Sequence, residues 1–378
     1  LYLWHWPLLV FTLVLTGQDS VGLLGGLAVI GVAIGLSFAS THVVERPIRS
    51  ISLKGRRAWS VPLLLTALVV PVAATGYAVA TVSSRVVPID TVLDAEVYPG
   101  ASVAGPGGTS LTAANTEEPA PGIASAPDDI PEVYAQGCHQ EQTIDAVAVC
   151  EYGDPDSGRT MILTGGSHSA HWQPALELVA EQTGWHLMSA TKSGCRPGTN
   201  LVSPDSEDVS INRDPAATDE QRLSCRAWNE ASEQWIIEQD PDLVVLTSTV
   251  GVAEDETVPT AYLRLWEELD EHSIEVLAIR DTPRPGRDIP DCLAAEGPPT
   301  RECDTVRADV ILPASATDTL PEGPNNVTFA DLSDYLCDPD VCPPVIGNVV
   351  VYSDEDHMTR SYSRSLGDAL LEVAPVLR

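Results

Sequence analysis

The chain has 378 residues and carries 54 acidic side chains against 21 basic ones, which gives a formal net charge of −33 at pH 7. This length exceeds one ordinary domain and leaves room for a membrane segment beside a catalytic domain. So much negative charge repels nucleic acids and anionic lipid headgroups, and we expect neither as a partner.

Three apolar segments open the chain. Residues 1–15 form a short one, whereas residues 21–44 and 61–82 are each long enough to cross a hydrocarbon core of about 30 Å. Because the segments follow one another and lack charged faces, we interpret them as transmembrane helices rather than core helices of a soluble domain. The first residue is Leu1, not Met, so we expect residues 1–83 to be the last helices of a membrane domain that is cut at its start.

The loop between the second and third apolar segments is basic. It contains five cationic side chains, those of Arg46, Arg49, Lys54, Arg56 and Arg57. Such loops stay on the cytoplasmic side of a membrane, so the third segment is predicted to run outward. We therefore expect a multi-pass protein of the cell membrane, with everything after about residue 84 outside the cytoplasm.

The composition changes twice beyond the membrane segments. Residues 84–130 are rich in Pro, Gly, Ala, Ser and Thr, which is typical of a flexible linker. In residues 131–378 short apolar strands alternate with helical stretches. The predicted strands are 161–164, 186–190, 243–247, 275–279 and 347–352, and the predicted helices are 169–182, 219–238, 259–272 and 359–373. This alternation predicts an α/β domain with a doubly wound parallel sheet that helices cover on both faces.

A candidate nucleophile, Ser167, follows an apolar strand and two glycines in the segment TMILTGGSH, residues 160–168. Glycines permit a tight turn and a close approach of backbone. The serine then stands at the carboxyl end of a strand and at the start of a helix, whose free N–H groups suit an oxyanion. The alternative is that Ser167 only caps this helix. We expect His168 and His171 on the helix surface, with a place in the lining of the pocket as the alternative.

A second candidate element is YSDEDHMT, residues 352–359, directly after the last predicted strand. A serine hydroxyl needs a base within hydrogen-bond reach, and a third group must orient that base. His357 suits the base and Asp354 the orienting carboxylate, with Asp356 as the competing carboxylate. A D-x-x-H pattern alone more often marks a surface loop, but its predicted place at another strand end of the same sheet favours catalysis.

All eight cysteines lie beyond residue 137 and form neighbouring couples along the chain. The couples are Cys138 with Cys150, Cys195 with Cys225, Cys292 with Cys303, and Cys337 with Cys342. We expect disulfides that close short loops in an oxidising compartment, although the sequence alone leaves their connectivity open. Free thiols or a metal site are the alternative, which the spacing does not favour.

Several motifs together resemble known families. The GxSH and D-x-x-H motifs resemble the SGNH hydrolase superfamily, which implies a flavodoxin-like fold. LYLWHWP at residues 1–7 and VERPIR at 44–49 resemble the end of the acyltransferase-3 membrane domain, a family in which an SGNH domain follows an extra membrane helix. KSGC at 192–195, DTPRP at 281–285 and the cysteine pair before YSDEDH agree with this resemblance.

The resemblance implies a role for each motif residue. Ser167 matches the nucleophile, and Asp354 and His357 match the orienting acid and the base. Gly194 matches the glycine whose backbone N–H forms the oxyanion hole together with that of Ser167. Gly166 stands where many members have the aspartate of a GDS motif.

The third motif block departs from the family pattern, because it offers no asparagine after residues 243–246. Thr247 and Ser248 stand there instead. The resemblance implies that a hydroxyl or backbone amide of one of them completes the oxyanion hole.

The activity that the resemblance implies is O-acyl transfer to a hydroxyl of an extracytoplasmic glycan or glycolipid, with acetyl as the expected group. The membrane domain would deliver the acyl donor, Ser167 would carry the acyl group as an ester, and no metal or organic cofactor is expected. An esterase would use the same triad with water as the acceptor. A non-catalytic wall-binding domain would be favoured if Ser167 and His357 lay too far apart to hydrogen-bond.

Overall fold

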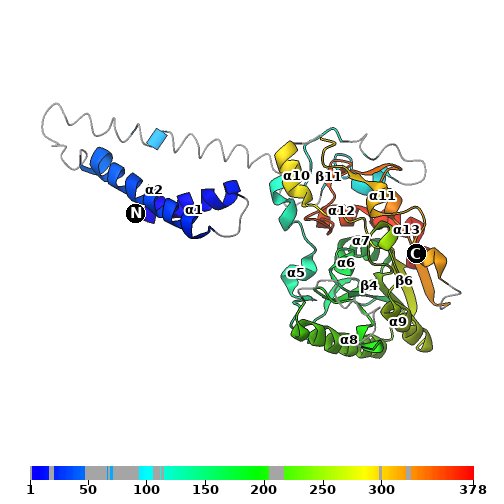
Figure 1. Cartoon of the computed structure of the whole chain (residues 1–378). Coiled ribbons are helices and arrows are strands. Elements are labelled where there is room, and N and C mark those ends of the chain that lie inside the picture. The colour runs from blue at the N-terminus through cyan, green and yellow to red at the C-terminus, as the bar shows by residue number, and fades with distance from the viewer. Residues whose placement is uncertain are drawn as a thin grey trace. The chain divides into compact units, whose positions relative to one another are not determined.

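The computed structural model describes residues 2–16, 21–46, 66, 69–70, 93–104, 111, 115–203, 217–297, 300–320 and 325–378. The chain divides into two compact units, Leu1–Arg85 and Val86–Arg378, which Figure 1 draws in blue and in cyan to red.

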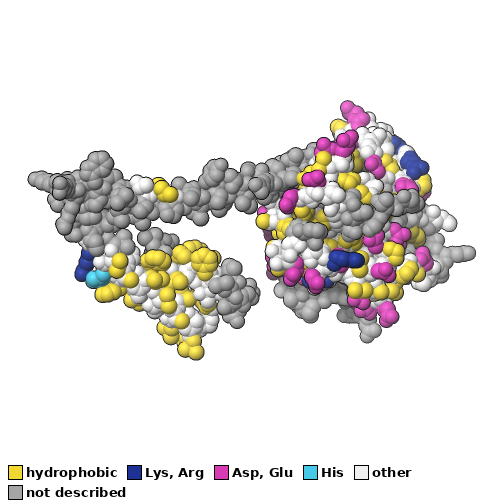
Figure 2. All heavy atoms as spheres, turned by 90° about the horizontal axis from the view of Figure 1, so that it is seen from above, with side chains coloured by type: hydrophobic (Ala, Val, Ile, Leu, Met, Phe, Trp, Pro, Cys, Tyr) yellow, Lys and Arg dark blue, Asp and Glu magenta, His cyan; other side chains and the backbone are white. Residues whose placement is uncertain are grey.

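The first unit contains helix α1, Tyr2–Thr16, and helix α2, Leu23–Ser40, which continues as a π-helical turn over Thr41–Glu45. Within the described residues, one helix is long and apolar enough to cross a membrane: Leu23–Val43, with 21 residues and a mean hydropathy of 2.1. Figure 2 shows the hydrophobic side chains that cover this unit. Most of the third predicted span and of the basic loop lies outside the described residues, so the multi-pass topology stays a prediction.

A mostly parallel sheet forms the centre of the second unit. Its strands are β1 (His139–Gln140), β2 (Cys150–Gly153), β3 (Thr160–Gly165), β4 (His186–Lys192), β5 (Leu243–Thr247), β6 (Glu275–Ile279) and β8 (Val327–Ala330). The order is β1-β4-β3-β5-β6-β8, all parallel, and β2 pairs antiparallel with β4.

Helices cover both faces of this sheet. One layer contains α7 (Gln173–Thr183), α12 (Arg360–Ser365) and α13 (Gly367–Val373), and the other contains α8 (Asp219–Gln239) and α9 (Thr260–Glu271). Because successive strand residues point to opposite faces, Met161 and Leu163 join the first core whereas Ile162 joins the second. The predicted doubly wound fold is confirmed.

Shorter elements lie around the sheet. They are α5 (Glu132–Gln136), α6 (Ser167–Ala170), α10 (Ile289–Glu296), α11 (Arg307–Val310), the strand pairs β7 (Thr305–Val306) with β9 (Val341–Cys342) and β10 (Val345–Ile346) with β11 (Val349–Val350), and the 3₁₀ turns Gly100–Val103, Ile123–Asp128, Thr199–Leu201, Ala253–Asp255, Ala316–Thr319, Ser333–Tyr335 and Pro375–Leu377. All four neighbouring cysteine couples form disulfides, as expected.

The predicted last strand, 347–352, does not belong to the central sheet, and that expectation is wrong. Only Val349–Val350 is a strand, and it pairs antiparallel with β10 in a separate sheet. The other edge of this strand bonds to Ala120. The carbonyl of Ala120 accepts the N–H of Val350, and its N–H donates to the carbonyl of Asn348. The backbone of the strand is therefore paired without the central sheet. The edge strand β8, which we did not predict, is the last strand of the central sheet.

The prediction of a flexible linker over 84–130 is also wrong for the described stretches 93–104 and 115–130. Ala101, Ala120 and Ala126 are fully buried, and Ala101 and Ala126 belong to the main core. Composition misled here because small residues, which suit a linker, also let two backbones pack closely. These stretches belong to the second unit.

Gly100 offers a test of this packing. Its φ is +51°, and a Cβ atom there would clash with Oγ of Ser365, which already accepts the N–H of Ala101 at 2.9 Å. We expect Gly100→Ala to lower the free energy of unfolding by about 1–3 kcal/mol. Gly158→Ala is the matched control, because an added Cβ meets nothing within 4 Å there. Equal denaturation midpoints for the two variants of the full chain would contradict this packing.

Candidate active site

The two glycines before Ser167 create the turn that presents it. Gly165 ends β3 with φ +124°, a conformation that side chains rarely adopt, and a Cβ atom there would clash with Oγ of Ser169. A Cβ atom on Gly166 would lie 3.1 Å from the carbonyl oxygen of Cys195. A side chain at this position would therefore crowd the loop that carries Cys195. Ser167 then begins α6.

His357 connects the candidate nucleophile to the candidate acid. Its Nε2 lies 2.7 Å from Oγ of Ser167, and its Nδ1 lies 2.8 Å from Oδ2 of Asp354. The residues come from the start of α6 and from the loop after β11, which are 190 positions apart in the sequence. The structure thus brings together the three residues that the sequence singled out, in the arrangement of a nucleophile, a base and an orienting acid.

Asp354 also shapes the loop that carries His357. Its Oδ1 accepts the backbone N–H of Asp356 at 2.9 Å and that of His357 at 2.7 Å. The N–H of Ser353 donates to the carbonyl of His357 at 2.9 Å, which closes the loop. One carboxylate therefore holds both the imidazole ring and the backbone from which the ring projects.

Asp356 binds the same ring atom. Its Oδ1 lies 3.0 Å from Nδ1 of His357, and its Oδ2 lies 3.3 Å from Nη1 of Arg284 and 3.4 Å from Nε2 of His168. Both carboxylates that the sequence left in competition thus contact His357, and Asp356 links it to further charged groups.

A cavity of about 290 Å³ lies over the candidate nucleophile. Three of the four predicted oxyanion-hole residues line it, namely Ser167, Gly194 and Thr247. Ser248 does not line it: the residue is buried, and its N–H donates to the carbonyl of Ile279 at 2.6 Å. Pairing of β5 with β6 uses the amide of Ser248, so this amide is not available to an oxyanion.

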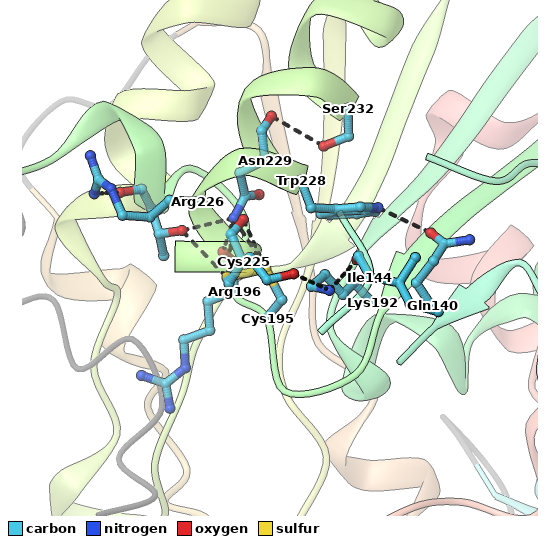
Figure 3. Close-up of a disulfide and its surroundings, with 12 residues drawn as sticks. Gln140, Ile144, Lys192, Cys195, Arg196, Cys225, Arg226, Trp228, Asn229 and Ser232 are labelled. Carbon is cyan, nitrogen blue, oxygen red and sulfur yellow. Dashed lines mark hydrogen bonds between the residues drawn. A yellow bond between two sulfur atoms is a disulfide. The ribbon is translucent and has the colours of Figure 1, made fainter. Parts of the chain in front are cut away.

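The loop that carries Gly194 is tied to α8. The neighbouring Cys195 forms a disulfide with Cys225, and Nδ2 of Asn229 donates to the carbonyl of Arg196 at 2.8 Å, as Figure 3 shows. Gly194 itself has φ +59°, which favours glycine. These contacts hold the glycine beside the cavity.

A family model described as "SGNH domain (fused to AT3 domains)" matches residues 137–372. The chain belongs to this SGNH family.

No curated protein matches the chain. The periplasmic domain of a lipopolysaccharide acetyltransferase from Salmonella serovar Paratyphi A is similar in structure, with 14% identity, a TM-score of 0.43, and coverage of 64% of this chain and 87% of that one. A predicted acylhydrolase from Bacteroides fragilis shows 13% identity, a TM-score of 0.28, and coverage of 60% and 91%.

The two carboxylates of this SGNH site determine the charge of its base. Burial works against the charged form of His357, but the hydrogen bonds and charges of Asp354 and Asp356 outweigh it and raise the pKa of His357 to about 10. Burial likewise opposes the charge of each carboxylate, yet the bonds to His357, and for Asp356 also those to His168, lower the pKa of both. At neutral pH the proton therefore resides on His357.

A second carboxylate–imidazole pair lies beside the first. Nδ1 of His168 is 2.8 Å from Oδ1 of Asp281, whose Oδ2 accepts from Nη2 of Arg284 at 2.6 Å. Burial favours the neutral form of Asp281, but His168 and Arg284 hold its pKa well below the usual range. The rings of His168 and His357 lie 4.8 Å apart, centre to centre. Sequence reasoning missed this pair, although the DTPRP motif that supplies Asp281 and Arg284 was a signal.

The expectation that His168 and His171 lie on the helix surface is wrong. The side chain of His168 is 13% exposed, and His171 is fully buried. Within the described chain neither ring nitrogen of His171 has a hydrogen-bond partner, and burial lowers its pKa well below the usual value. His171 directly follows α6, and Oγ of Ser363 in α12 donates to its carbonyl, so α12 covers this end of the segment.

Two groups of side chains in the SGNH site have ligand atoms within 4.8 Å of one another: His168, His171 and Asp281, and His168, Asp356 and His357. Arg284, however, bonds to both Asp281 and Asp356. Its positive charge opposes a cation at the same carboxylates. We assign no metal to either group.

Proposed function

We propose that this SGNH domain transfers an acyl group, through an ester on Ser167, to a hydroxyl of an extracytoplasmic glycan or glycolipid. The observation that carries the proposal is the 2.7 Å contact between Nε2 of His357 and Oγ of Ser167, with Asp354 bonded to the other ring nitrogen. The same contact removes the reason to favour a non-catalytic wall-binding domain.

The arrangement supports two half-reactions. In the first, neutral His357 accepts the hydroxyl proton while Oγ of Ser167 attacks the acyl carbonyl, and His357 then gives that proton to the leaving group. In the second, His357 takes the proton of the acceptor hydroxyl, whose oxygen attacks the ester, and returns that proton to Oγ of Ser167 as the ester bond breaks. The N–H groups of Ser167 and Gly194, with Thr247 beside them, are proposed to stabilise the negative oxygen in both.

Several features support transfer of a small acyl group outside the cytoplasm. The family description names a fusion to AT3 domains, and we propose that the N-terminal apolar segments are the end of such a membrane domain and anchor the chain in the cell membrane. Four disulfides are typical of an oxidising compartment. A cavity of about 290 Å³ fits acetyl better than a long chain.

The test uses the full chain in detergent micelles with p-nitrophenyl acetate and an array of neutral mono- to tetrasaccharides. We expect an acetyl adduct on Ser167 by intact mass, no adduct in Ser167→Ala, and an unchanged adduct in Ser102→Ala, a substitution of an exposed serine. Acetyl on a sugar would support transfer, whereas acetate alone would favour the esterase. A folded parent chain without any adduct would contradict both.

A further inference from the structure

A second cavity, of about 770 Å³, lies beside the catalytic one. We call it the side cavity; the segment between residues 139 and 148 lines most of it, together with Tyr134, Ser193 and Gln221. Gln142 lines both cavities, and Ser193 directly precedes Gly194 of the catalytic cavity. A ligand in the side cavity would thus lie next to the acyl group on Ser167.

The wall of the side cavity is fixed from three directions. A disulfide between Cys138 and Cys150 closes the ends of the segment. Lys192 is fully buried beneath it, and its Nζ donates to the carbonyls of Glu141, at 2.8 Å, and Ile144; Figure 3 shows the second bond. The side chain of Gln221 also donates to that of Gln142. A wall held in this way needs little ordering when a ligand binds.

Small side chains give the cavity its width. Val147 and Val149 pack against the core around Trp228, whereas Ala146 and Ala148 line the cavity. This alternation is that of an extended segment whose neighbouring side chains point in opposite directions. A large side chain in place of either alanine would therefore fill the cavity rather than disturb the core.

The lining favours a neutral ligand with many hydroxyl groups. Its polar side chains are mostly uncharged, including those of Gln140, Gln142, Thr143 and Ser193, and its only charged member is Glu141. None of the lining residues is a lysine or an arginine, so nothing in the wall attracts a phosphate or a carboxylate, and the strongly negative chain repels both.

His139 adds a buried polar group that lacks one partner. The residue is only 8% exposed, its Nδ1 lies 2.8 Å from Oγ1 of Thr191, and its ring lies 4.3 Å from that of Tyr134. Within the described residues its Nε2 has no hydrogen-bond partner. Because such a group is costly to leave unpaired, a ligand hydroxyl that reached it would gain a favourable bond.

We propose that the side cavity binds a neutral sugar unit of the acceptor and directs a hydroxyl of that unit, or of its neighbour, toward the ester on Ser167. The side chains of Gln142 and Ser193 would bond to its hydroxyls, the ring of His139 would do so after a small movement that uncovers its Nε2, and Tyr134 would cover the apolar face of the sugar. The inference rests on the proposed acyl transfer and adds the class of acceptor to it.

To test this, Ala148 is replaced by tryptophan (Ala148→Trp), whose side chain should fill the side cavity, and the full chain is studied in detergent micelles. Binding of neutral mono- to tetrasaccharides is measured by calorimetry in a Ser167→Ala background, and the ratio of sugar ester to free acetate is measured in the active chain. We expect Ala148→Trp to weaken the binding of the best sugar and to lower this ratio, each at least tenfold. Ala295→Trp, which alters an exposed alanine of α10 outside both cavities, should change neither more than twofold.

Thr143→Trp fills the same cavity from its exposed rim and replaces Ala148→Trp if that variant does not fold. Sugar binding that neither tryptophan weakens, or a parent chain that binds no sugar of the array, would overturn the inference. Failure of the proposed function gives a different result: no acetyl adduct on Ser167, with sugar binding still sensitive to the tryptophans.

Discussion

Replacing His357 by alanine is expected to reduce the turnover of an activated acetyl ester by about four orders of magnitude or more. Its Nε2 is 2.7 Å from Oγ of Ser167, and a serine hydroxyl without a base is a weak nucleophile. Initial rates with p-nitrophenyl acetate in the full chain measure the loss.

Two comparisons separate this loss from a general effect on the fold. Because nucleophile and base act as one unit, the double variant Ser167→Ala, His357→Ala should be no slower than Ser167→Ala alone. The control is His272→Ala, since this partly exposed histidine at the end of α9 has a single ion pair, 3.8 Å from Glu268. Additive losses, or a less than tenfold loss in folded His357→Ala, would contradict the assigned base.

The features that the sequence predicted well depend on local patterns. The alternation of strands and helices from residue 161 to 279 follows from the spacing of hydrophobic residues along the chain. The turn before Ser167 needs a glycine at Gly165 because the φ angle there is positive. The cysteine couples are close in sequence, so their loops close easily. The loop of Asp354 and His357 likewise shapes itself through hydrogen bonds between neighbours.

The features that the sequence did not predict depend on partners far along the chain. The amide of Ser248 is unavailable only because β6 lies beside it. Gly100 is packed only because residues near 347 and 365 lie against it. The side chain of His168 bonds to that of Asp281, which comes 113 positions later. Composition and periodicity carry no information about such contacts, and so the expected linker and the expected surface histidines were wrong.

Asp354 and Asp356 contact the same nitrogen of His357, but their other hydrogen-bond partners differ. Asp354 bonds to two backbone N–H groups of its own loop through Oδ1. Asparagine can keep these two bonds, but it would then turn its NH2 group toward Nδ1 of His357, so we expect this replacement to reduce activity at every pH. Asp356 instead bonds to Arg284 and lies near His168. Its hydrogen bond to His357 and its negative charge both raise the pKa of the ring.

Asp356→Asn is accordingly expected to move the rising limb of kcat/KM against pH to lower pH by about one unit or more. Attack requires neutral His357, whose pKa is raised to about 10, and each unit by which this pKa falls gives about tenfold more neutral base at pH 7.

The stability of Asp356→Asn should change in the opposite sense. A raised folded-state pKa stabilises the fold fully below its ordinary value of 6.5, and the contribution is lost as the pH rises toward 10. Asp356→Asn should therefore be less stable than the parent near pH 7, with a difference that narrows as the pH rises toward 10. Rate profiles and denaturation midpoints measured from pH 6 to about 10.5 test both, and an unmoved rate limb would show that Asp356 does not set the charge of the base.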